Sequence, residues 1–436
     1  MNNVAVLGLG KSGVAAMKLL LNKGYNVYVY DDNETQLNKY INTFNVGILT
    51  ADNMDNLEFA VISPGVADDN KTVIELKNRS VKIISELELG YLNTQSDIIA
   101  VTGTNGKTST TTLITDFLNT SYINAYPLGN IGTPLCEKAE TLMKSDVAVV
   151  EASSFQLKYI DTFKPHIAII LNITKDHIDR HKTYEDYITS KCNIIKNQSS
   201  TDYAILNYDE KIITATKKAA CHKIYFSSMR KLENGYYLKD GEIYYASKGK
   251  EVYICDRSDT DSTCIDNALA LLAVCGILKL PYAVAINTLK RFKPAKYTVE
   301  KIYDNKNLKV FNDSKGTNTA ATVNAVNLMR GETVLIMGGR EKGEKYSDFF
   351  KTVNDKIKHF VFFGENAESL RDVVLRIGVK RFTVCKTLED AYVAAKSEIS
   401  IGNILFSPAC ASFDQYKNYA ERGAAFERIV KKYNEE

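Results

Sequence analysis

The stretch Val101-Thr102-Gly103-Thr104-Asn105-Gly106-Lys107-Thr108-Ser109 decides how this chain folds. It follows the apolar run Ile98–Val101, which is typical of a buried strand, and leads into a helical pattern. Backbone N–H groups of such a turn can wrap phosphate oxygens, while Lys107 and the Thr108 hydroxyl suit phosphates and Mg²⁺. The stretch therefore predicts a phosphate-binding loop in a parallel α/β sheet, although Val101 stands where the longer form of the motif has its first glycine.

A second glycine-rich turn lies near the start of the chain, in Gly8-Leu9-Gly10-Lys11-Ser12-Gly13. The run Val4–Leu7 before it is typical of a strand, and a helical pattern extends from about Gly13 to Lys23. Glycines here let backbone amides approach a diphosphate at a helix N-terminus. The turn predicts a site for a dinucleotide, as in an NAD-dependent dehydrogenase, or for a uridine diphosphate, and the residues alone leave both open.

Two acidic residues and a further turn accompany this first loop. Asp31 and Asp32 follow the predicted strand Asn26–Tyr30, about twenty residues beyond the glycines, where dinucleotide-binding folds place a ribose contact. Ser63-Pro64-Gly65 comes at the end of another predicted strand, Phe59–Ser63. Both features predict ligand contacts at the carboxyl edge of a parallel sheet.

The length of 436 residues predicts about three domains of roughly 150 residues each. The strand pattern restarts after the polar stretch Asn93–Asp97, and Phe292–Lys296, with its proline, is typical of a linker. The predicted domains are residues 1–93, 94–296 and 297–436. Alternating apolar and polar residues within 225–253 predict antiparallel hairpins, forming a side sheet of the second domain.

Composition excludes several classes of protein. The net charge of +3 is the remainder of 55 basic and 52 acidic residues, so no global basic field predicts nucleic-acid binding. The eight cysteines form no C-x-x-C pair, which argues against a zinc site or a disulfide framework and favours a reducing cytoplasm. No secretion signal and no run of about 18 apolar residues occurs, so we expect a cytoplasmic protein without membrane insertion.

Later motifs follow predicted strands, at the sheet edge where ligands bind. They are Glu151–Leu157 after Val147–Glu151, Asn172–His181 after Ile167–Asn172, Asp313–Asn318 after Lys309–Asn312, Gly338–Gly343 after Thr333–Met337, and Ser407–Tyr419 after Asn403–Phe406. A lone glutamate or histidine in such a loop is usually solvated. The series, together with the phosphate loop, favours a ligand site.

The loop Gly103–Thr108 and the order of these motifs resemble the Mur ligases, which are ATP-dependent enzymes that form amide bonds, and their folylpolyglutamate synthase relatives. The resemblance spans all three segments. It implies an α/β fold with a Rossmann-like first domain, a central P-loop ATPase-type domain with a mostly parallel sheet, and a Rossmann-like third domain. It also implies ATP and two Mg²⁺ ions, and no NAD.

The resemblance implies roles around the phosphates. Thr108 and Glu151 would hold one Mg²⁺ and His177 a second. Lys191 matches a lysine that the family carbamylates, which turns an ammonium into an anion able to orient Mg²⁺. The implied catalytic residues are Lys107, Glu151, His177 and Lys191. The implied ATP-binding residues are Gly103, Thr104, Asn105, Gly106, Lys107, Thr108, Ser109, Asn267, Lys296 and Asp313.

The substrates are implied by both ends of the chain. The stretch Ser407–Tyr419, continuing into Glu421-Arg422-Gly423, closely resembles the family members that add D-glutamate to UDP-N-acetylmuramoyl-L-alanine. The implied residues for the nucleotide sugar are Lys11, Ser12, Asp31, Asp32, Gly65, Asn130 and Ser153. Those for D-glutamate are Lys315, Thr317, Lys342, Ser412, Phe413 and Tyr419. We expect a monomer that binds these small molecules.

Two stretches depart from the family pattern. Thr263-Cys264 stands where the family usually has His-Asn, which leaves only Asn267 of the adenine-side asparagines. Ala295-Lys296 or Lys296-Tyr297, depending on the alignment, stands where the family usually has His-Arg, and a lysine does not replace the bidentate fork of an arginine.

Other functions remain open at this point. A sister ligase for another amino acid, or a folylpolyglutamate synthase, would share Gly103–Thr108 but should lack the ending Ser407–Tyr419. An NAD-dependent oxidoreductase would explain Gly8–Gly13 but leaves the phosphate loop without a role. A mechanical or transport NTPase would hydrolyse ATP without an amino acid, and a non-catalytic subunit should have lost Glu151 or Lys191.

Overall fold

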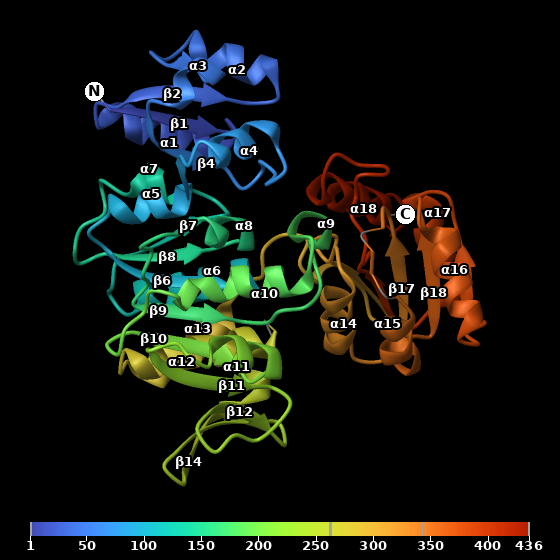
Figure 1. The fold of residues 1–436 in the computed structure, drawn as a ribbon. Coiled ribbons are helices and arrows are strands. Elements are labelled where there is room, and N and C mark those ends of the chain that lie inside the picture. Colours follow the sequence, from blue (N-terminus) through green and yellow to red (C-terminus); the bar gives the residue numbers. More distant parts are fainter. Residues whose placement is uncertain (1, 261–263, 342, 345, 435–436) are drawn as a thin grey trace. The chain divides into compact units, whose positions relative to one another are not determined.

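The computed structural model describes residues 2–260, 264–341, 343–344 and 346–434. By their contacts the residues divide into two compact units. The first unit comprises Met1–Ile173 and Ile178–Phe292, and the second comprises Thr174–His177 and Lys293–Glu436. Within the described ranges the strands form three sheets, two in the first unit and one in the second (Figure 1).

The N-terminal sheet is parallel, with the strand order β3-β2-β1-β4-β5. Its strands are β1 (Asn3–Leu7), β2 (Asn26–Tyr30), β3 (Gly47–Ile48), β4 (Leu57–Ile62) and β5 (Lys82–Ser85), and its helices are α1 (Lys11–Asn22), α2 (Glu34–Ile41), α3 (Ala51–Met54), α4 (Lys71–Asn78) and α5 (Glu86–Leu92). Helix α1 buries Ala16, Met17 and Leu20 against the valines of β1 and β2, and Gly24, at φ +80°, follows its end. This places the loop before α1 at the carboxyl edge of β1.

The central sheet has the order β14-β13-β12-β11-β10-β9-β6-β8-β7. Its strands are β6 (Asp97–Thr102), β7 (Ala125–Gly129), β8 (Val147–Glu151), β9 (Ile167–Ile170), β10 (Tyr203–Asn207), β11 (His222–Ser227), β12 (Gly235–Lys239), β13 (Glu242–Ser247) and β14 (Lys250–Asp256). The predicted antiparallel hairpins are present as β12, β13 and β14. They continue the central sheet, because β11 and β12 pair in parallel through Phe226 and Tyr236, instead of forming a sheet of their own.

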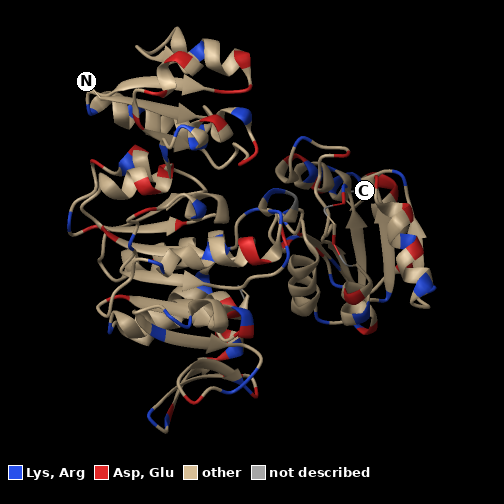
Figure 2. Ribbon diagram, viewed as in Figure 1, with Lys and Arg blue, Asp and Glu red and all other residues tan. Residues whose placement is uncertain are grey.

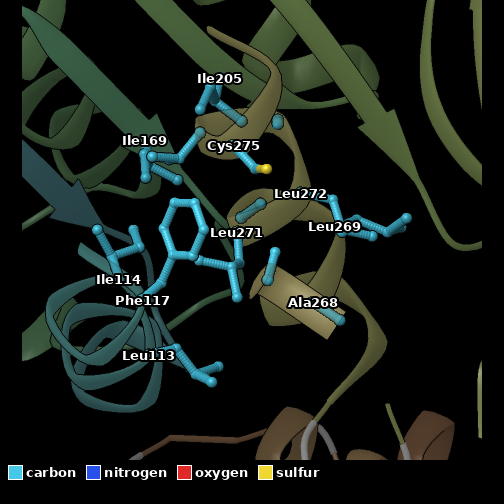
Figure 3. Packing of buried hydrophobic residues seen from close by; sticks show 14 of the residues in the cluster. Leu113, Ile114, Phe117, Ile169, Ile205, Ala268, Leu269, Leu271, Leu272 and Cys275 are labelled. Atoms are coloured by element: carbon cyan, nitrogen blue, oxygen red, sulfur yellow. The ribbon is translucent and has the colours of Figure 1, made fainter. Parts of the chain in front are cut away.

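The helices of the central region cover both faces of its sheet. They are α6 (Lys107–Thr120), α7 (Leu135–Lys138), α8 (Ser154–Lys158), α9 (Ile178–His181), α10 (Tyr184–Cys192), α11 (Glu210–Thr216), α12 (Ile265–Ile277) and α13 (Tyr282–Arg291). Figure 3 shows Phe117 of α6 facing Leu271 of α12, and both side chains are fully buried. Burial of each such side chain stabilises the fold by about 1.5–3 kcal/mol. The core fixes α6, and with it the phosphate loop, against the sheet.

The sheet of the second unit has the order β15-β16-β20-β17-β18-β19, in which only the described edge strand β15 is antiparallel. The strands are β15 (Glu300–Asp304), β16 (Leu308–Asn312), β17 (Thr333–Gly338), β18 (His359–Phe363), β19 (Phe382–Val384) and β20 (Gly402–Phe406), and the helices are α14 (Thr319–Leu328), α15 (Tyr346–Val353), α16 (Ala367–Arg376), α17 (Leu388–Glu398) and α18 (Tyr419–Asn434). Adjacent strands β16, β20 and β17 place the loops that follow them at one edge.

The α/β architecture predicted for the N-terminal, central and C-terminal parts of the chain is confirmed, with the predicted side sheet present as the edge of the central sheet. Figure 2 shows acidic and basic residues interspersed on the helices of each unit, in keeping with the small net charge. No helix in the described part of the chain is both long enough and apolar enough to span a membrane.

Candidate active site

The first glycine loop is held by its neighbours. Gly8 has φ +85°, and a Cβ on Gly13 would lie 1.7 Å from the Gly8 carbonyl oxygen, so a side chain at Gly13 cannot be accommodated without movement. The Ser63 hydroxyl donates to Gly8 O at 2.7 Å, and Leu9 N donates to the Asp31 carboxylate at 2.6 Å. The loop is thereby fixed before any ligand binds.

A cavity of about 580 Å³ opens beside this loop. Six residues predicted for the nucleotide sugar line it: Lys11, Ser12, Asp31, Asp32, Gly65 and Asn130. Ser153 is not among the lining residues; its hydroxyl accepts from Gln156 N and caps α8. The cavity has backbone donors, an exposed lysine and two carboxylates, which suit the diphosphate and the sugar hydroxyls of a nucleotide sugar.

The phosphate loop lies between β6 and α6. Gly103 and Gly106 have φ of +158° and +86°, and the latter is in the left-handed region that favours glycine. Asn172 braces the loop from the end of β9, because its amide oxygen accepts from Asn105 N at 2.8 Å and its amide nitrogen donates to Asn105 O at 3.1 Å. Asn172 O also accepts from Thr104 N at 2.9 Å.

Two ammonium groups meet at one carbonyl of the phosphate loop. Lys107 Nζ donates to Gly103 O at 2.9 Å and to Thr104 O at 2.8 Å. Lys191 Nζ donates to the same Gly103 O at 2.7 Å, and this side chain is only 2% exposed. The ammonium of Lys191 also lies 4.7 Å from the centre of the Tyr187 ring. The loop thus holds concentrated positive charge beside its backbone N–H groups.

Thr108 and Glu151 provide hard oxygen atoms at the start of α6. The Thr108 hydroxyl donates to Glu151 Oε2 at 2.9 Å, and Asn130 Nδ2 donates to Glu151 Oε1 at 3.1 Å. Glu151 is 1% exposed. This donor set fits Mg²⁺, which usually takes one or two protein oxygens and completes its shell with phosphate and water. Within the described residues no group of three or more His, Cys, Asp or Glu could hold a metal by itself.

The remaining residues predicted near ATP occupy different settings. Ser109 is buried in α6, and the Asn267 amide oxygen would be 2.5 Å from a Cβ on Gly106, so Asn267 lies directly beside the phosphate loop. His177 belongs to the second unit; it has φ +54°, and its Nε2 lies 3.7 Å from Asp176. Lys296 Nζ pairs with Glu427 at 3.2 Å on the surface of the second unit.

Asp313 lies buried where β16 ends. Its Oδ2 accepts from the Ser407 hydroxyl at 2.6 Å and its Oδ1 accepts from Val299 N at 3.1 Å. Burial raises the pKa of the Asp313 carboxyl to about 7, although these hydrogen bonds oppose the shift. The carboxyl group therefore joins the loop after β16 to the loop after β20.

The residues predicted for D-glutamate lie on loops of this same sheet edge. Lys315 and Thr317 are half-buried in the loop after β16, and Tyr419 is half-buried at the start of α18. Ser412 is buried and Phe413 is 61% exposed in the loop after β20. Lys342 lies outside the described residues.

Backbone pairing ties two of these loops together. Arg340 N donates to Ala411 O at 2.9 Å, and Ala411 N donates to Arg340 O at 3.0 Å. The structure therefore holds the loop after β17, which carries Arg340, against the loop after β20, which carries Ser412.

Arg422, for which the sequence predicted no role, fastens the loops of the second unit. It is fully buried in α18, and its guanidinium donates to Cys410 O, Ala411 O and Ser314 O at 2.9–3.1 Å and to the Ser314 hydroxyl at 3.1 Å. Burial lowers its pKa to about 10. An arginine within an otherwise apolar helical stripe is the one signal that could have indicated Arg422.

Asn172 and Arg180 also have structural partners that the sequence did not predict.

Comparison with known proteins matches three successive stretches of the chain to one family. Residues 2–85 match the N-terminal domain of MurD-like Mur ligases, residues 101–273 match the Mur ligase middle domain, and residues 299–410 match the Mur ligase glutamate ligase domain. The chain belongs to the Mur ligase family.

Its curated relatives point to one branch of this family. The chain is 36% identical to the UDP-N-acetylmuramoylalanine--D-glutamate ligases of Lachnoclostridium phytofermentans and Thermoanaerobacter pseudethanolicus, over 98% of this chain and 97% of theirs. It is 34% identical to the ligase of that name from Clostridioides difficile, over 98% of each chain.

Solved structures share the fold at low sequence identity. The UDP-N-acetylmuramate-alanine ligase MurC of Thermotoga maritima matches with a TM-score of 0.59 and 17% identity over 99% of both chains. A pseudomurein peptide ligase type C from Methanothermus fervidus matches with a TM-score of 0.60 and 16% identity, covering 99% of this chain and 100% of the other.

Proposed function

We propose that this chain is an ATP-dependent ligase that joins D-glutamate to UDP-N-acetylmuramoyl-L-alanine in the cytoplasmic synthesis of peptidoglycan precursors. One observation carries the proposal: the phosphate loop brings Lys107 and Lys191 to Gly103 O, with Thr108 and Glu151 2.9 Å apart beside it. The near-complete match to curated D-glutamate ligases supports the choice of substrates. We further propose that the active chain is a monomer with domains 1–93, 94–296 and 297–436.

The phosphate loop would bind ATP through its backbone N–H groups and Lys107. On binding, Lys107 would exchange its bonds to the carbonyls of Gly103 and Thr104 for bonds to phosphate oxygens. Asn267, beside Gly106, would lie on the adenine side, with Lys296 and Asp313 as further contacts. Bound Mg²⁺ would offset negative charge on the phosphates, held by Thr108 and Glu151, with His177 at a second ion.

Lys191 would act as a carbamate. Addition of CO₂ to the neutral amine forms an N–C bond, releases one proton and leaves an anion in place of an ammonium. That anion could orient Mg²⁺, and burial beside Tyr187 would shield it from water. Carbamylation would also end the donation from the ammonium of Lys191 to Gly103 O.

The two other substrates would bind at the two remaining sets of loops. The nucleotide sugar would occupy the cavity beside Gly8–Gly13, where Lys11 and Ser12 face the diphosphate and Asp31 and Asp32 accept from hydroxyl groups, with Gly65, Asn130 and Ser153 as further contacts. D-Glutamate would bind through Lys315, Thr317, Lys342 and Ser412, with Phe413 and Tyr419 beside it. Ammonium and hydroxyl donors suit a dianionic amino acid.

The reaction would proceed in two displacements. The alanyl carboxylate of the nucleotide sugar attacks the γ-phosphorus of ATP, and the bond to the β-phosphate oxygen breaks, giving an acyl phosphate and ADP. The amine of D-glutamate then attacks the acyl carbonyl, loses a proton, and phosphate leaves as the amide forms. Lys107 stabilises the charge on the transferring phosphoryl group, which is mainly positioning and electrostatics.

Phosphate release from ATP tests this proposal. UDP-N-acetylmuramoyl-L-alanine is supplied with D-glutamate, L-glutamate, L-lysine, meso-diaminopimelate or no amino acid. We expect release only when the nucleotide sugar and D-glutamate are both present. Turnover with a different amino acid would keep the ligase and reject the substrate, whereas release that ignores the nucleotide sugar would reject both.

A further inference from the structure

Arg180, on α9, joins the turn beside the nucleotide-sugar cavity to Phe155 of α8. Its guanidinium donates through Nη1 to Pro64 O at 2.9 Å and through Nη2 to Val66 O at 2.8 Å. Pro64, Gly65 and Val66 line the cavity beside the first glycine loop. A single side chain on α9, 114 to 116 residues away in sequence, therefore holds both ends of this turn.

The guanidinium is itself held in place by an aromatic ring. Its central carbon lies 3.9 Å from the centre of the Phe155 ring, close enough for a cation–π contact. Phe155 also stacks on His181 at 4.8 Å, and His181 Nε2 lies 2.9 Å from the Ser154 hydroxyl. Arginine suits this position because its planar fork can face two carbonyl oxygens while its face covers a ring, which lysine cannot do.

The Pro64–Val66 turn, which Arg180 holds, also fixes the glycine loop. Ser63, directly before Pro64, donates from its hydroxyl to Gly8 O at 2.7 Å. The Cγ2 atom of Val66 would lie only 2.7 Å from a Cβ on Gly8, so the turn packs closely against the glycine loop. A shift of the Pro64–Val66 turn would therefore also release the loop that is expected to face the diphosphate.

We propose that Arg180 is a positioning residue that sets the affinity for the nucleotide sugar by holding the Pro64–Val66 turn. The inference rests on the nucleotide-sugar substrate of the proposed function. Arg180 contacts the cavity through this turn, so we expect its effect to fall on the nucleotide sugar. Phe155 shares the role, because it orients the guanidinium.

The test compares Arg180→Lys with Arg79→Ala by steady-state kinetics. Arg79 is a matched control, since it also makes two hydrogen bonds, to Asp55 at 2.6 Å and Glu75 at 2.8 Å, but contributes nothing to the cavity lining. We expect Arg180→Lys to raise the KM for UDP-N-acetylmuramoyl-L-alanine about tenfold, equivalent to about 1.4 kcal/mol, with the KM for ATP changed less than about twofold. Arg79→Ala should change neither constant.

Two further measurements separate positioning from general stability. Methylguanidinium added to Arg180→Ala should restore part of the affinity for the nucleotide sugar, and Phe155→Leu should shift the same KM in the same direction by less. Equal rises in both KM values, no change in either, or loss of the folded state in Arg180→Lys would each overturn the proposal.

Calorimetric titration with UDP-N-acetylmuramoyl-L-alanine measures binding without turnover, so it tests the role of Arg180 independently of the proposed function. Wild-type protein that binds UDP-N-acetylmuramoyl-L-alanine but never turns it over with D-glutamate would reject the proposed function alone. The roughly tenfold loss of that binding in Arg180→Lys would still support the role of Arg180. Unchanged binding in Arg180→Lys would reject it, whatever the kinetics of the wild type.

Discussion

The two glycine-rich loops of the first unit have the same strand-to-helix setting but are held in opposite ways. Loop 8–13 is held from outside, by the Ser63 hydroxyl at Gly8 O and by the Asp31 carboxylate at Leu9 N, and a cavity opens beside it. In loop 103–108 the carbonyl oxygen of Gly103 already accepts hydrogen bonds from two ammonium groups, those of Lys107 and Lys191.

The difference indicates how each loop would meet its ligand. Loop 8–13 can accept a diphosphate without breaking any of the bonds that fix it, so changes to this loop should alter the affinity for the ligand more than the rate. Loop 103–108 must give up the bonds from Lys107 to the carbonyls of Gly103 and Thr104 before the ammonium can reach a phosphate. Part of its binding energy is therefore used to rearrange the loop, and its side chains should matter more for rate than for affinity.

The largest expected effect sharpens this contrast by removing one lysine from each loop. Lys107→Ala should lower kcat by about 10³-fold, because a charge-stabilising donor is lost from the transferring phosphoryl group. Lys11→Ala, in the first cavity, should instead raise the KM for the nucleotide sugar about tenfold with kcat nearly unchanged. Steady-state phosphate release measures both. Similar effects on kcat from the two variants would contradict the contrast.

Metal dependence gives the next effect. Glu151→Gln should lower kcat about 10²-fold and raise the Mg²⁺ concentration needed for half-maximal rate, since a neutral amide oxygen is a weaker ligand for a hard cation. Chelation of Mg²⁺ should abolish phosphate release in the wild type. The exposed Glu185, exchanged for glutamine, provides the control and should leave the Mg²⁺ titration unchanged. An unaltered titration for Glu151→Gln would remove this carboxylate from the metal site.

Alanine substitutions at two glycines of the first loop should have different effects, one on the stability of the fold and the other on ligand binding. Gly13→Ala places a Cβ against Gly8 O and should destabilise the protein by about 1–3 kcal/mol. Gly10→Ala meets nothing within 4 Å and should melt like the wild type, yet weaken nucleotide-sugar binding about tenfold because the ligand needs close approach to the backbone. Thermal melting and calorimetric titration check the pair, and full affinity in Gly10→Ala would show that the ligand does not pack against this loop.

The smallest effect concerns Glu86, at the junction of the two loop-bearing sheets. Its carboxyl accepts from Cys136 N at 2.7 Å, and complete burial raises its pKa from the ordinary 4.5 to about 7. Because the folded protein holds this proton more tightly than the unfolded chain, Glu86 contributes fully to the stability of the fold below about pH 4.5. That contribution to the free energy of unfolding is lost as the pH rises through about 7. Relative to Glu86→Gln, the wild type should therefore lose a few degrees of melting temperature between pH 5 and pH 8. A constant difference between the two proteins would mean that Glu86 is not buried as a neutral group.

Many of the strands could be predicted because short runs of apolar, β-branched residues are enough to indicate them. The strands β2 and β8 coincide with the predicted runs Asn26–Tyr30 and Val147–Glu151, whose β-branched residues are typical of buried parallel strands. The strand β7 was missed, because Pro127 interrupts it and only an edge position tolerates that proline. The strand β3 was missed because it has only two residues.

The site was predicted less completely, for a physical reason. Lys11 and Asp31 could be predicted from motifs and Asn130 from the family resemblance, and the structure brings all three to one cavity. Arg180 and Arg422 could not be assigned roles, because most of their partners are backbone carbonyls distant in sequence, which carry no side-chain signature. Lys191 has the sequence context of a solvated lysine, and only the packing around it reveals its burial.

The position of Arg422 along the chain determines when the loops after β16 and β20 can be joined during synthesis. Ser314 precedes Arg422 by 108 residues, so at about 5–20 residues per second the ribosome adds it several seconds earlier. Throughout that interval the Ser314 carbonyl lacks the guanidinium that binds it in the folded protein. Cys410 and Ala411 are added only 12 and 11 residues before Arg422. The nascent chain can thus form its phosphate loop well before the loops that Arg422 joins are complete.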